Sequence, residues 1–380
     1  MLLIDFVRAA YSACHQSIGV YEWDESVVLR KRLGNQPDFN SLTIQRPDLQ
    51  FSAWSLAHAV VKADYLDNRS LLGPGIGFLL QSHRIIDWST KPVRLVDGAS
   101  KALNDVTYSS LAARVGQGFA MLYGHQLGME FLAHLSSHVS ESHPERSGER
   151  MADFIFADKK KTIIIESKAS FSLQSNDSSS IKRVLKDALT NQVEPWMVEV
   201  SPPASNGYVV YTCMRETSWA PSSISVVDPE GDGSLRGDMD LGVEHVMRRN
   251  YASWLTAMGL SGAASRLMRG YGGGIRDGSH ESLSVPFVRF SLGDRSYGLP
   301  FVSIQMSDGY GFGRLVMALD TRVLQSLETV INDPRATMKE LLAEAELGVG
   351  DVGRSVSVFP DGSLFGVVVM PQLEVINFQL

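Results

Sequence analysis

Residues 152–168 read ADFIFADKKKTIIIESK, which is two short apolar runs joined by a polar, lysine-rich connection. Each run has the length and the aromatic or β-branched content of a β-strand, so the stretch predicts a β-hairpin. With a turn centred between Lys159 and Lys160, the register brings Asp153 opposite Glu166. A slip of one residue would move one carboxylate to the other face, so the expectation depends on this register.

The opposed carboxylates are the feature that carries chemistry. Side chains directly opposite each other in a hairpin have Cβ atoms about 4.5–5.5 Å apart, so two carboxylates there repel each other. A divalent cation between Asp153 and Glu166 would remove this conflict, because hard cations bind carboxylate oxygens at about 2.0–2.6 Å. Lys168 follows Glu166 by two residues and shares its face of the strand. Its ammonium group can orient a nucleophilic water or stabilise charge on a phosphate.

A structural explanation competes with this one. A Glu-x-Lys triplet is common by chance, and a cross-strand pair of an acid and a lysine is usually a solvated surface contact. Here the triplet ends the apolar run 163–165, which indicates a buried central strand. Ligands usually bind at the carboxyl ends of such strands in α/β sheets. This position favours a functional site.

Helical patterns flank the hairpin on both sides. The first, over 107–139, contains Glu130, which could reach the same end of the strand. Four glycines interrupt it, which makes sense where another element packs closely against the helix. The second pattern, over 181–194, places Gln192 on its apolar stripe. An inward-facing glutamine is often an ordinary buried hydrogen-bonding group, so both explanations stay open.

The side of the second helix opposite the apolar stripe is basic. It carries Lys182, Arg183 and Lys186 in a chain whose formal net charge is −7. These residues are candidates for phosphate contacts with a nucleic acid. Helix surfaces also carry such charges without any ligand.

Together these residues resemble the PD-(D/E)xK nuclease superfamily, which has the restriction-endonuclease-like fold. Four positions carry the resemblance, namely Glu130, Asp153, Glu166 and Lys168. Residues 192–196 (QVEPW) are similar to the Gln-x-x-x-Tyr element of one branch, with Trp196 in place of Tyr. Ala152 stands where a proline often precedes the aspartate, and that proline carries no ligand.

The resemblance implies a nuclease that depends on Mg²⁺ or Mn²⁺ and hydrolyses phosphodiesters, with DNA as the expected substrate. The metal ligands would be Asp153, Glu166 and Glu130. Lys168 and Gln192 would complete the catalytic site, with Gln192 steadying the groups around Lys168 or a phosphate. The superfamily often serves restriction, repair or defence against mobile DNA. The alternative is a nuclease-like protein that has lost cleavage and acts as a nucleic-acid-binding or scaffold protein.

The order of the patterns predicts an α/β protein with a restriction-endonuclease-like α/β/α core around a mixed sheet. We expect this core over residues 106–230. Residues 1–105 are expected to form a mostly helical region of unknown role. Residues 231–380 are expected to form an α+β region for substrate selection or oligomerisation, after a Gly- and Asp-rich loop that suggests a boundary.

Composition excludes several other classes. The 380 residues are 44% hydrophobic and 20% charged, as in ordinary globular proteins. The N-terminal residues lack the pattern of a signal peptide, no stretch is apolar enough for a membrane span, and two cysteines give no disulfide framework. These features predict a cytoplasmic protein without a membrane partner. The acidic net charge requires that a nucleic acid be bound by a local positive patch, by metal ions, or with help from a second copy or a partner protein.

Overall fold

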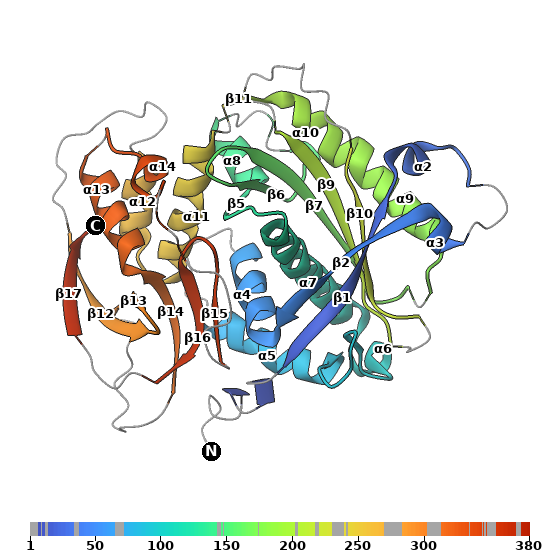
Figure 1. The fold of residues 1–380 in the computed structure, drawn as a ribbon, viewed down its shortest axis with the longest axis horizontal. Helices are drawn as coiled ribbons and strands as arrows, with labels where there is room; N and C mark the ends of the chain where they lie inside the picture. Colours follow the sequence, from blue (N-terminus) through green and yellow to red (C-terminus); the bar gives the residue numbers. More distant parts are fainter. Residues whose placement is uncertain are drawn as a thin grey trace.

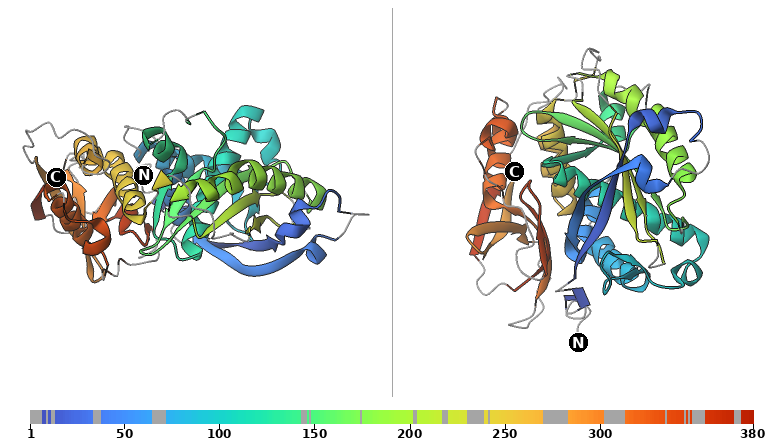
Figure 2. Two further views of the ribbon diagram at one scale, coloured as in Figure 1. Left: turned by 90° about the horizontal axis from the view of Figure 1, so that it is seen from above. Right: turned by 45° about the vertical axis from the view of Figure 1, so that its right-hand side comes forward.

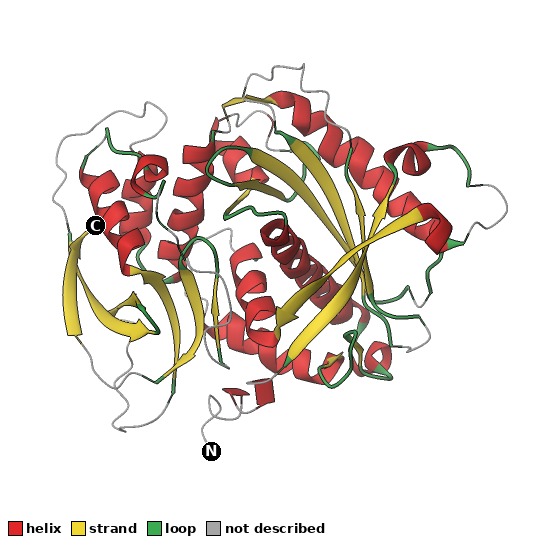
Figure 3. Ribbon diagram, in the orientation of Figure 1, coloured by secondary structure: helices red, strands yellow, loops and turns green. Residues whose placement is uncertain are grey.

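The computed structural model describes the greater part of the chain. The described residues are 7–8, 10–11, 14–33, 38–64, 72–142, 146, 148–173, 175–201, 204–216, 220–229, 239–240, 242–269, 283–301, 313–333, 335–343, 345, 347, 355–369 and 374–380. They form a mixed α/β structure with two large sheets (Figure 1; Figure 3, strands in yellow). No helix of this part is long and apolar enough to cross a membrane.

The first sheet has seven strands in the order β2-β1-β10-β9-β7-β6-β5. Most neighbours are antiparallel, whereas β7 runs parallel to β9 and β1 runs parallel to β10. The sheet is therefore mixed, as expected. In chain order its strands are β1 (His15–Trp23), β2 (Thr43–Ser52), β5 (Phe131–His134), β6 (Phe154–Ala157), β7 (Thr162–Ser170), β9 (Asn206–Cys213) and β10 (Ser223–Val227).

The hairpin of β6 and β7 has the register expected from the sequence. Ile155 pairs with Ile164, and Phe154 pairs with Ile165. The β6 residues and residues 162–166 of β7 are buried, because helices cover both faces of the sheet. This burial explains the unbroken apolar run in β7.

Helix α7 (Asp105–Gln126) covers one face of the sheet, and α9 (Ser178–Ala188) and α10 (Glu194–Glu199) cover the other. A Cβ atom at Gly116 of α7 would lie 2.5 Å from the Cβ of Ala169 on β7. Glu166 faces the α9 side, where it contacts Gln192. Since alternate residues of a strand point to opposite faces, the two helical layers lie on opposite sides of β7.

The close approach of α7 to β7 gives a stability prediction. Gly116→Ala should lower the free energy of unfolding by about 1–3 kcal/mol, because the methyl group collides with the rigid Ala169 and overpacks the contact. Gly77 in α5 (Leu72–Ile85) is a matched control, since a Cβ there meets nothing within 4 Å. Gly77→Ala should instead stabilise the protein by up to about 1 kcal/mol. Urea unfolding measures the change in the free energy of unfolding for both variants, and equal changes would contradict the prediction.

The helix expected over 107–139 ends early, and this part of the prediction is wrong. Gly128 adopts φ +84°, and the N–H of Met129 bonds back to the carbonyl of Gly124 over 3.1 Å. This is the left-handed end of a Schellman motif, which only glycine adopts without strain. The chain then forms β5 and α8 (Leu135–Ser142).

The second flanking helix extends beyond its predicted end. A single π-helical turn (Leu189–Val193) links α9 to α10, and the N–H of Glu194 bonds to the carbonyl of Leu189. The wider turn shifts the hydrogen-bond ladder, so Pro195, which has no N–H, is accommodated within the helix that follows. Asp177 caps the start of α9 by accepting from the N–H groups of Ser179 and Ser180.

The second sheet has six antiparallel strands in the order β15-β16-β14-β13-β12-β17. It lies beside the first sheet, with α4 (Ala53–Ala63) and α11 between them (Figures 1 and 2). Its elements and the helices around it are α11 (Val243–Ala257), α12 (Ser261–Arg269), β12 (Ser284–Leu292), β13 (Arg295–Pro300), β14 (Arg314–Asp320), α13 (Thr321–Asn332), α14 (Met338–Leu341), β15 (Val356–Val358), β16 (Ser363–Val368) and β17 (Glu374–Gln379).

The expected division into three regions needs correction at its N-terminal side. Residues 1–105 do not form a separate, mostly helical region, because β1 and β2 extend the sheet of the core. One hydrophobic core continues from these strands into α11 and the second sheet. The expected boundary near residue 230 lies among residues that the structure does not describe. The remaining elements are α2 (Glu25–Leu29), α3 (Phe39–Leu42), β3 (Ile86–Asp87), β4 (Arg94–Leu95), α6 (Ala99–Ala102), β8 (Val200–Ser201) and β11 (Met239–Asp240).

Candidate functional site

Asp153 and Glu166 lie opposite each other where β6 begins. The N–H of Asp153 donates to Oε2 of Glu166 over 3.0 Å, and the N–H of Ser167 donates to Oδ2 of Asp153 over 3.0 Å. Each carboxylate is therefore held by the backbone of the opposite strand. The side chain of Glu166 is 1% exposed, whereas Asp153 is only partly buried. The two acids thus form a fixed pair that opens to solvent on the Asp153 side.

Lys168 lies on the same face as Glu166, as its spacing predicts. Its Nζ forms an ion pair with Oε1 of Glu166, and its side chain is 31% exposed. The ammonium group therefore lies at the border between the buried carboxylate and solvent. A cation in this position can hold a water molecule or contact an anionic substrate.

Gln192 completes this cluster. Its Nε2 donates to Oε1 of Glu166 over 2.8 Å and also lies 3.2 Å from the carbonyl of Met151. It is part of the π-helical turn, and such turns occur frequently at functional sites. The contact with Glu166 is compatible with both explanations left open by the sequence, a functional glutamine and an ordinary buried hydrogen-bonding group. The amide also satisfies a buried carboxylate, so it stabilises the cluster.

Sequence reasoning missed Arg150, which borders the cluster. Its Nη2 donates to Oε1 of Gln192 over 3.1 Å and to Oδ2 of Asp187 over 2.9 Å. Its carbonyl accepts the indole N–H of Trp196 over 2.9 Å. The only signal in the sequence was its place three residues before Asp153, in a polar loop without a recognisable motif.

The pKa values of both acids are raised. Burial is the main cause for Glu166, and the nearby Asp153 carboxylate adds to it, against the opposing effect of Lys168. Burial also raises the pKa of Asp153, while the Ser167 N–H and Lys168 counteract it. The site therefore disfavours two negative charges, which is the electrostatic condition that a bound cation would relieve.

Glu130 does not lie in this cluster, so the expectation that it shares the site is wrong. Its N–H bonds to the carbonyl of Ala157, at the opposite end of β6 from Asp153. The pKa of Glu130 is raised by burial and lowered by Lys159, a residue of the hairpin turn. The early end of α7 and the formation of β5 account for this position, because Glu130 precedes a strand that runs alongside β6.

The basic side of α9 also differs from the expectation. Nζ of Lys182 donates to the carbonyl of Arg30, and Nζ of Lys186 donates to the carbonyl of Leu29 over 2.9 Å. The two lysines satisfy carbonyl groups at the end of α2, and Lys182 is 7% exposed. Burial lowers the pKa of Lys182. Of the three residues expected to bind nucleic acid, Arg183 alone is exposed.

The set of possible metal ligands is small. In the described part of the chain, no group of three or more His, Cys, Asp or Glu side chains could hold a metal ion together. Asp153 and Glu166 offer two carboxylates. This is compatible with Mg²⁺, which keeps several waters and is bound through one or two carboxylates plus substrate phosphates. The Asp153 N–H bond to Glu166 and the Ser167 N–H bond to Asp153 hold the two carboxylates facing each other, which supports the fit.

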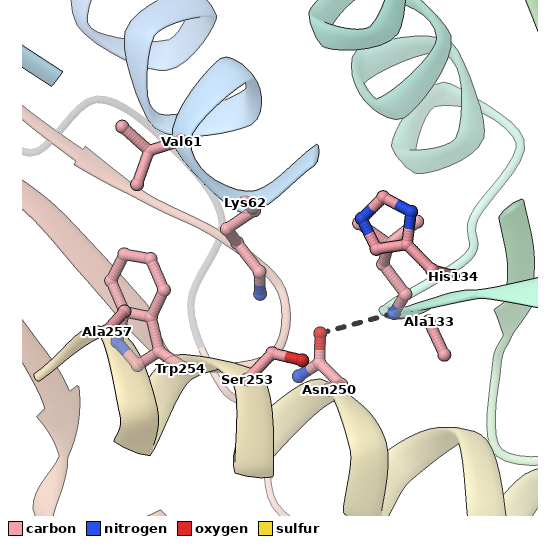
Figure 4. A pocket seen from close by; sticks show the side chains of 9 residues that line it. Val61, Lys62, Ala133, His134, Asn250, Ser253, Trp254 and Ala257 are labelled. Atoms are coloured by element: carbon pink, nitrogen blue, oxygen red, sulfur yellow. Dashed lines mark hydrogen bonds between the residues drawn. The ribbon is translucent and has the colours of Figure 1, made fainter. Parts of the chain in front are cut away.

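A second polar cluster is structural. Lys62 of α4 pairs with Asp361 of the β15–β16 turn, and their side chains are 4% and 0% exposed. Asn250 of α11 donates to the same carboxylate over 2.7 Å. The adjoining cavity, lined also by His134, has a volume of only about 10 Å³ (Figure 4). That volume matches about one water molecule, so no substrate can enter.

A cleft lies between β2, α7 and the β15–β16 hairpin. Its volume is about 500 Å³, and its walls include Phe51, Leu122 and Phe359. The described residues that line it include no lysine or arginine. It is therefore poorly suited to a polyanion, and it offers no pair of carboxylates.

Comparisons of the chain with protein-family models, with curated proteins and with solved structures give no significant match. The functional interpretation therefore rests on the cluster of Asp153, Glu166, Lys168 and Gln192.

The raised pKa values predict how stability depends on pH. In the folded apo protein the two carboxyl groups bind protons at higher pH than in the unfolded chain. As pH rises from about 4 toward neutrality, the folded state loses this advantage and the free energy of unfolding falls. Asp153→Asn removes one of the opposed charges, so its stability relative to wild type should rise by about 1 kcal/mol over this range. Denaturant unfolding in EDTA at several pH values measures this, and a difference that is constant with pH would contradict it.

Proposed function

We propose that this protein is a Mg²⁺- or Mn²⁺-dependent nuclease with a restriction-endonuclease-like core. The observation that carries the proposal is the cluster at the start of the β6–β7 hairpin, where two opposed carboxylates meet a lysine and a glutamine. The arrangement of the surrounding elements supports it. Helix α7 precedes β5, β6 and β7, then α9 and α10 lead to β9, which runs parallel to β7.

Each side chain has a role that follows from its contacts. Asp153 and Glu166 would hold the metal, because their carboxylates are opposed and fixed by backbone N–H groups. A metal bound there supplies Lewis acidity, which lowers the pKa of a bound water and neutralises charge on the phosphate. Lys168, which is partly exposed, would orient the attacking water or contact the phosphate. Gln192 positions Glu166 through its amide N–H.

A catalytically inactive nucleic-acid-binding or scaffold protein is the second candidate. It is favoured by the small number of ligands, since only two carboxylates meet in the described cluster and Glu130 lies at the other end of β6. The two candidates differ in a single measurable property, the hydrolysis of phosphodiester bonds.

The test is a cleavage assay on plasmid DNA, single-stranded DNA and RNA with Mg²⁺, Mn²⁺ or EDTA. We expect cleavage with either metal and none in EDTA, with DNA as the better substrate. Glu130→Gln is the matched control, because it changes a carboxylate outside the cluster, and it should keep activity. Glu166→Gln should lose it. Absence of cleavage with every substrate, or equal activity of the two variants, would overturn the proposal.

A further inference from the structure

The guanidinium group of Arg150 lies at the edge of the proposed nuclease site. It contacts Gln192 over 3.1 Å, and Gln192 contacts Glu166 over 2.8 Å. The side chain of Arg150 is 60% exposed. One amide therefore separates a solvent-accessible cation from the buried carboxylate of the site.

The backbone of Arg150 is fixed although its side chain is exposed. The buried Trp196 donates its indole N–H to the carbonyl of Arg150, and the guanidinium of Arg146 lies 4.4 Å from the centre of the Trp196 ring. The backbone of Arg150 is thus fixed to α10 through Trp196. Rearrangement of the guanidinium group requires only side-chain rotation.

Asp187 of α9 is the present anionic partner of Arg150. Its carboxylate accepts from Arg150 over 2.9 Å and from Nδ2 of Asn191 over 2.8 Å, and it is 51% exposed. An exposed pair of this kind contributes little to stability. The guanidinium fork matches a phosphate as well as a carboxylate, so a phosphate can take the place of Asp187.

Two of the three cations on the basic side of α9 are already engaged, and Arg183 alone is exposed. Lys182 and Lys186 donate to carbonyl groups at the end of α2. This side of α9 thus offers a polyanion one exposed cation, so we look to cations nearer the carboxylate cluster. Arg150 and Lys168 are the cations that contact the cluster in the described structure.

We propose that Arg150 binds a backbone phosphate of the nucleic acid beside the cleavage site, and that in the free protein Asp187 forms an ion pair with Arg150 in place of this phosphate. This inference rests on the proposed function and names the group that recognises the polyanion. Asp187 is a competitor, so substitutions at the two positions should change affinity in opposite directions.

The test measures binding of short labelled single-stranded and duplex DNA by fluorescence anisotropy in EDTA, at several salt concentrations. Arg150→Gln should raise Kd by roughly 10- to 100-fold, as expected for a lost charge-assisted hydrogen bond. It should also reduce the slope of log K against log salt by about 0.9 on duplex DNA. Asp187→Asn should lower Kd by about two- to fivefold. In the variant that carries both substitutions, Asp187→Asn should no longer increase the affinity for DNA.

Two variants control for net charge alone. Arg183→Gln removes an exposed positive charge from α9, and Asp294→Asn removes a negative charge from a residue whose side chain is 94% exposed. Arg183→Gln should change Kd less than Arg150→Gln does, and Asp294→Asn should change Kd less than Asp187→Asn does. Equal effects, or no DNA binding by wild type, would overturn the inference. Arg150-dependent binding without any cleavage would overturn the nuclease proposal alone, and cleavage without dependence on Arg150 would overturn this inference alone.

Discussion

Asp153→Asn is expected to lower the rate of phosphodiester cleavage by about 10³-fold or more while leaving the apo protein at least as stable as wild type. A metal ligand contributes several kcal/mol of transition-state stabilisation, and each 1.36 kcal/mol corresponds to a factor of ten. The asparagine Oδ1 can still accept the Ser167 N–H, so the hairpin keeps this contact. Burial is the main cause of the raised pKa of Glu166, and the repulsion from Asp153 that adds to it is removed at the same time.

The measurement combines cleavage rates with melting curves in EDTA and in Mn²⁺. Wild type should gain melting temperature with Mn²⁺, because a ligand that binds the folded state stabilises it. The variant should not. An apo variant that is clearly less stable than wild type and still cleaves DNA would mean that Asp153 is a structural carboxylate.

Asp361→Asn should have the largest effect on stability, about 3–5 kcal/mol, because it leaves the buried Lys62 without its charged partner. Burial lowers the pKa of Lys62, while Asp361 raises it. Asp361 also accepts from Asn250, and its carbonyl accepts the hydroxyl of Tyr251 over 2.9 Å. The turn of the β15–β16 hairpin thereby joins α4 to α11.

Chemical denaturation of two further variants controls this result. Glu22→Gln breaks an exposed pair with Arg46, whose side chains are 27% and 48% exposed, and should cost less than about 1 kcal/mol. Lys62→Met combined with Asp361→Asn should recover much of the loss, because no unpaired charge remains buried. A cost for Asp361→Asn as small as that for Glu22→Gln would show that Lys62 finds other partners.

The hairpin and its register followed from local sequence. The apolar runs of β6 and β7 and the short polar connection between them allow few alternatives, because a slip would expose one face of each strand. The inward position of Gln192 was predicted from the helical period of residues 181–192, although Gln192 lies in the π-helical turn that follows α9. These contacts are close in sequence or set by periodicity, so they could be predicted from the chain alone.

Glu130 and the basic side of α9 show where local reasoning fails. Leu132 and Leu135 fit a helical spacing, and the four residues of β5 are too few for a strand pattern to outweigh it. The lysines of α9 look solvated in sequence because α2, which covers them, lies about 150 residues earlier. The addition of β1 and β2 to the sheet is equally non-local. Such tertiary contacts leave no periodic signal near the residues they affect.

A crystal soaked in Mn²⁺ and measured for anomalous scattering tests directly whether Asp153 and Glu166 bind a metal ion together. We expect a peak between Asp153 and Glu166, about 2.0–2.6 Å from an oxygen of each carboxylate. The same soak of Asp153→Asn should show no peak there. Wild-type crystals that bind Mn²⁺ elsewhere, or not at all, while Lys168 and Gln192 still contact Glu166, would contradict this expectation.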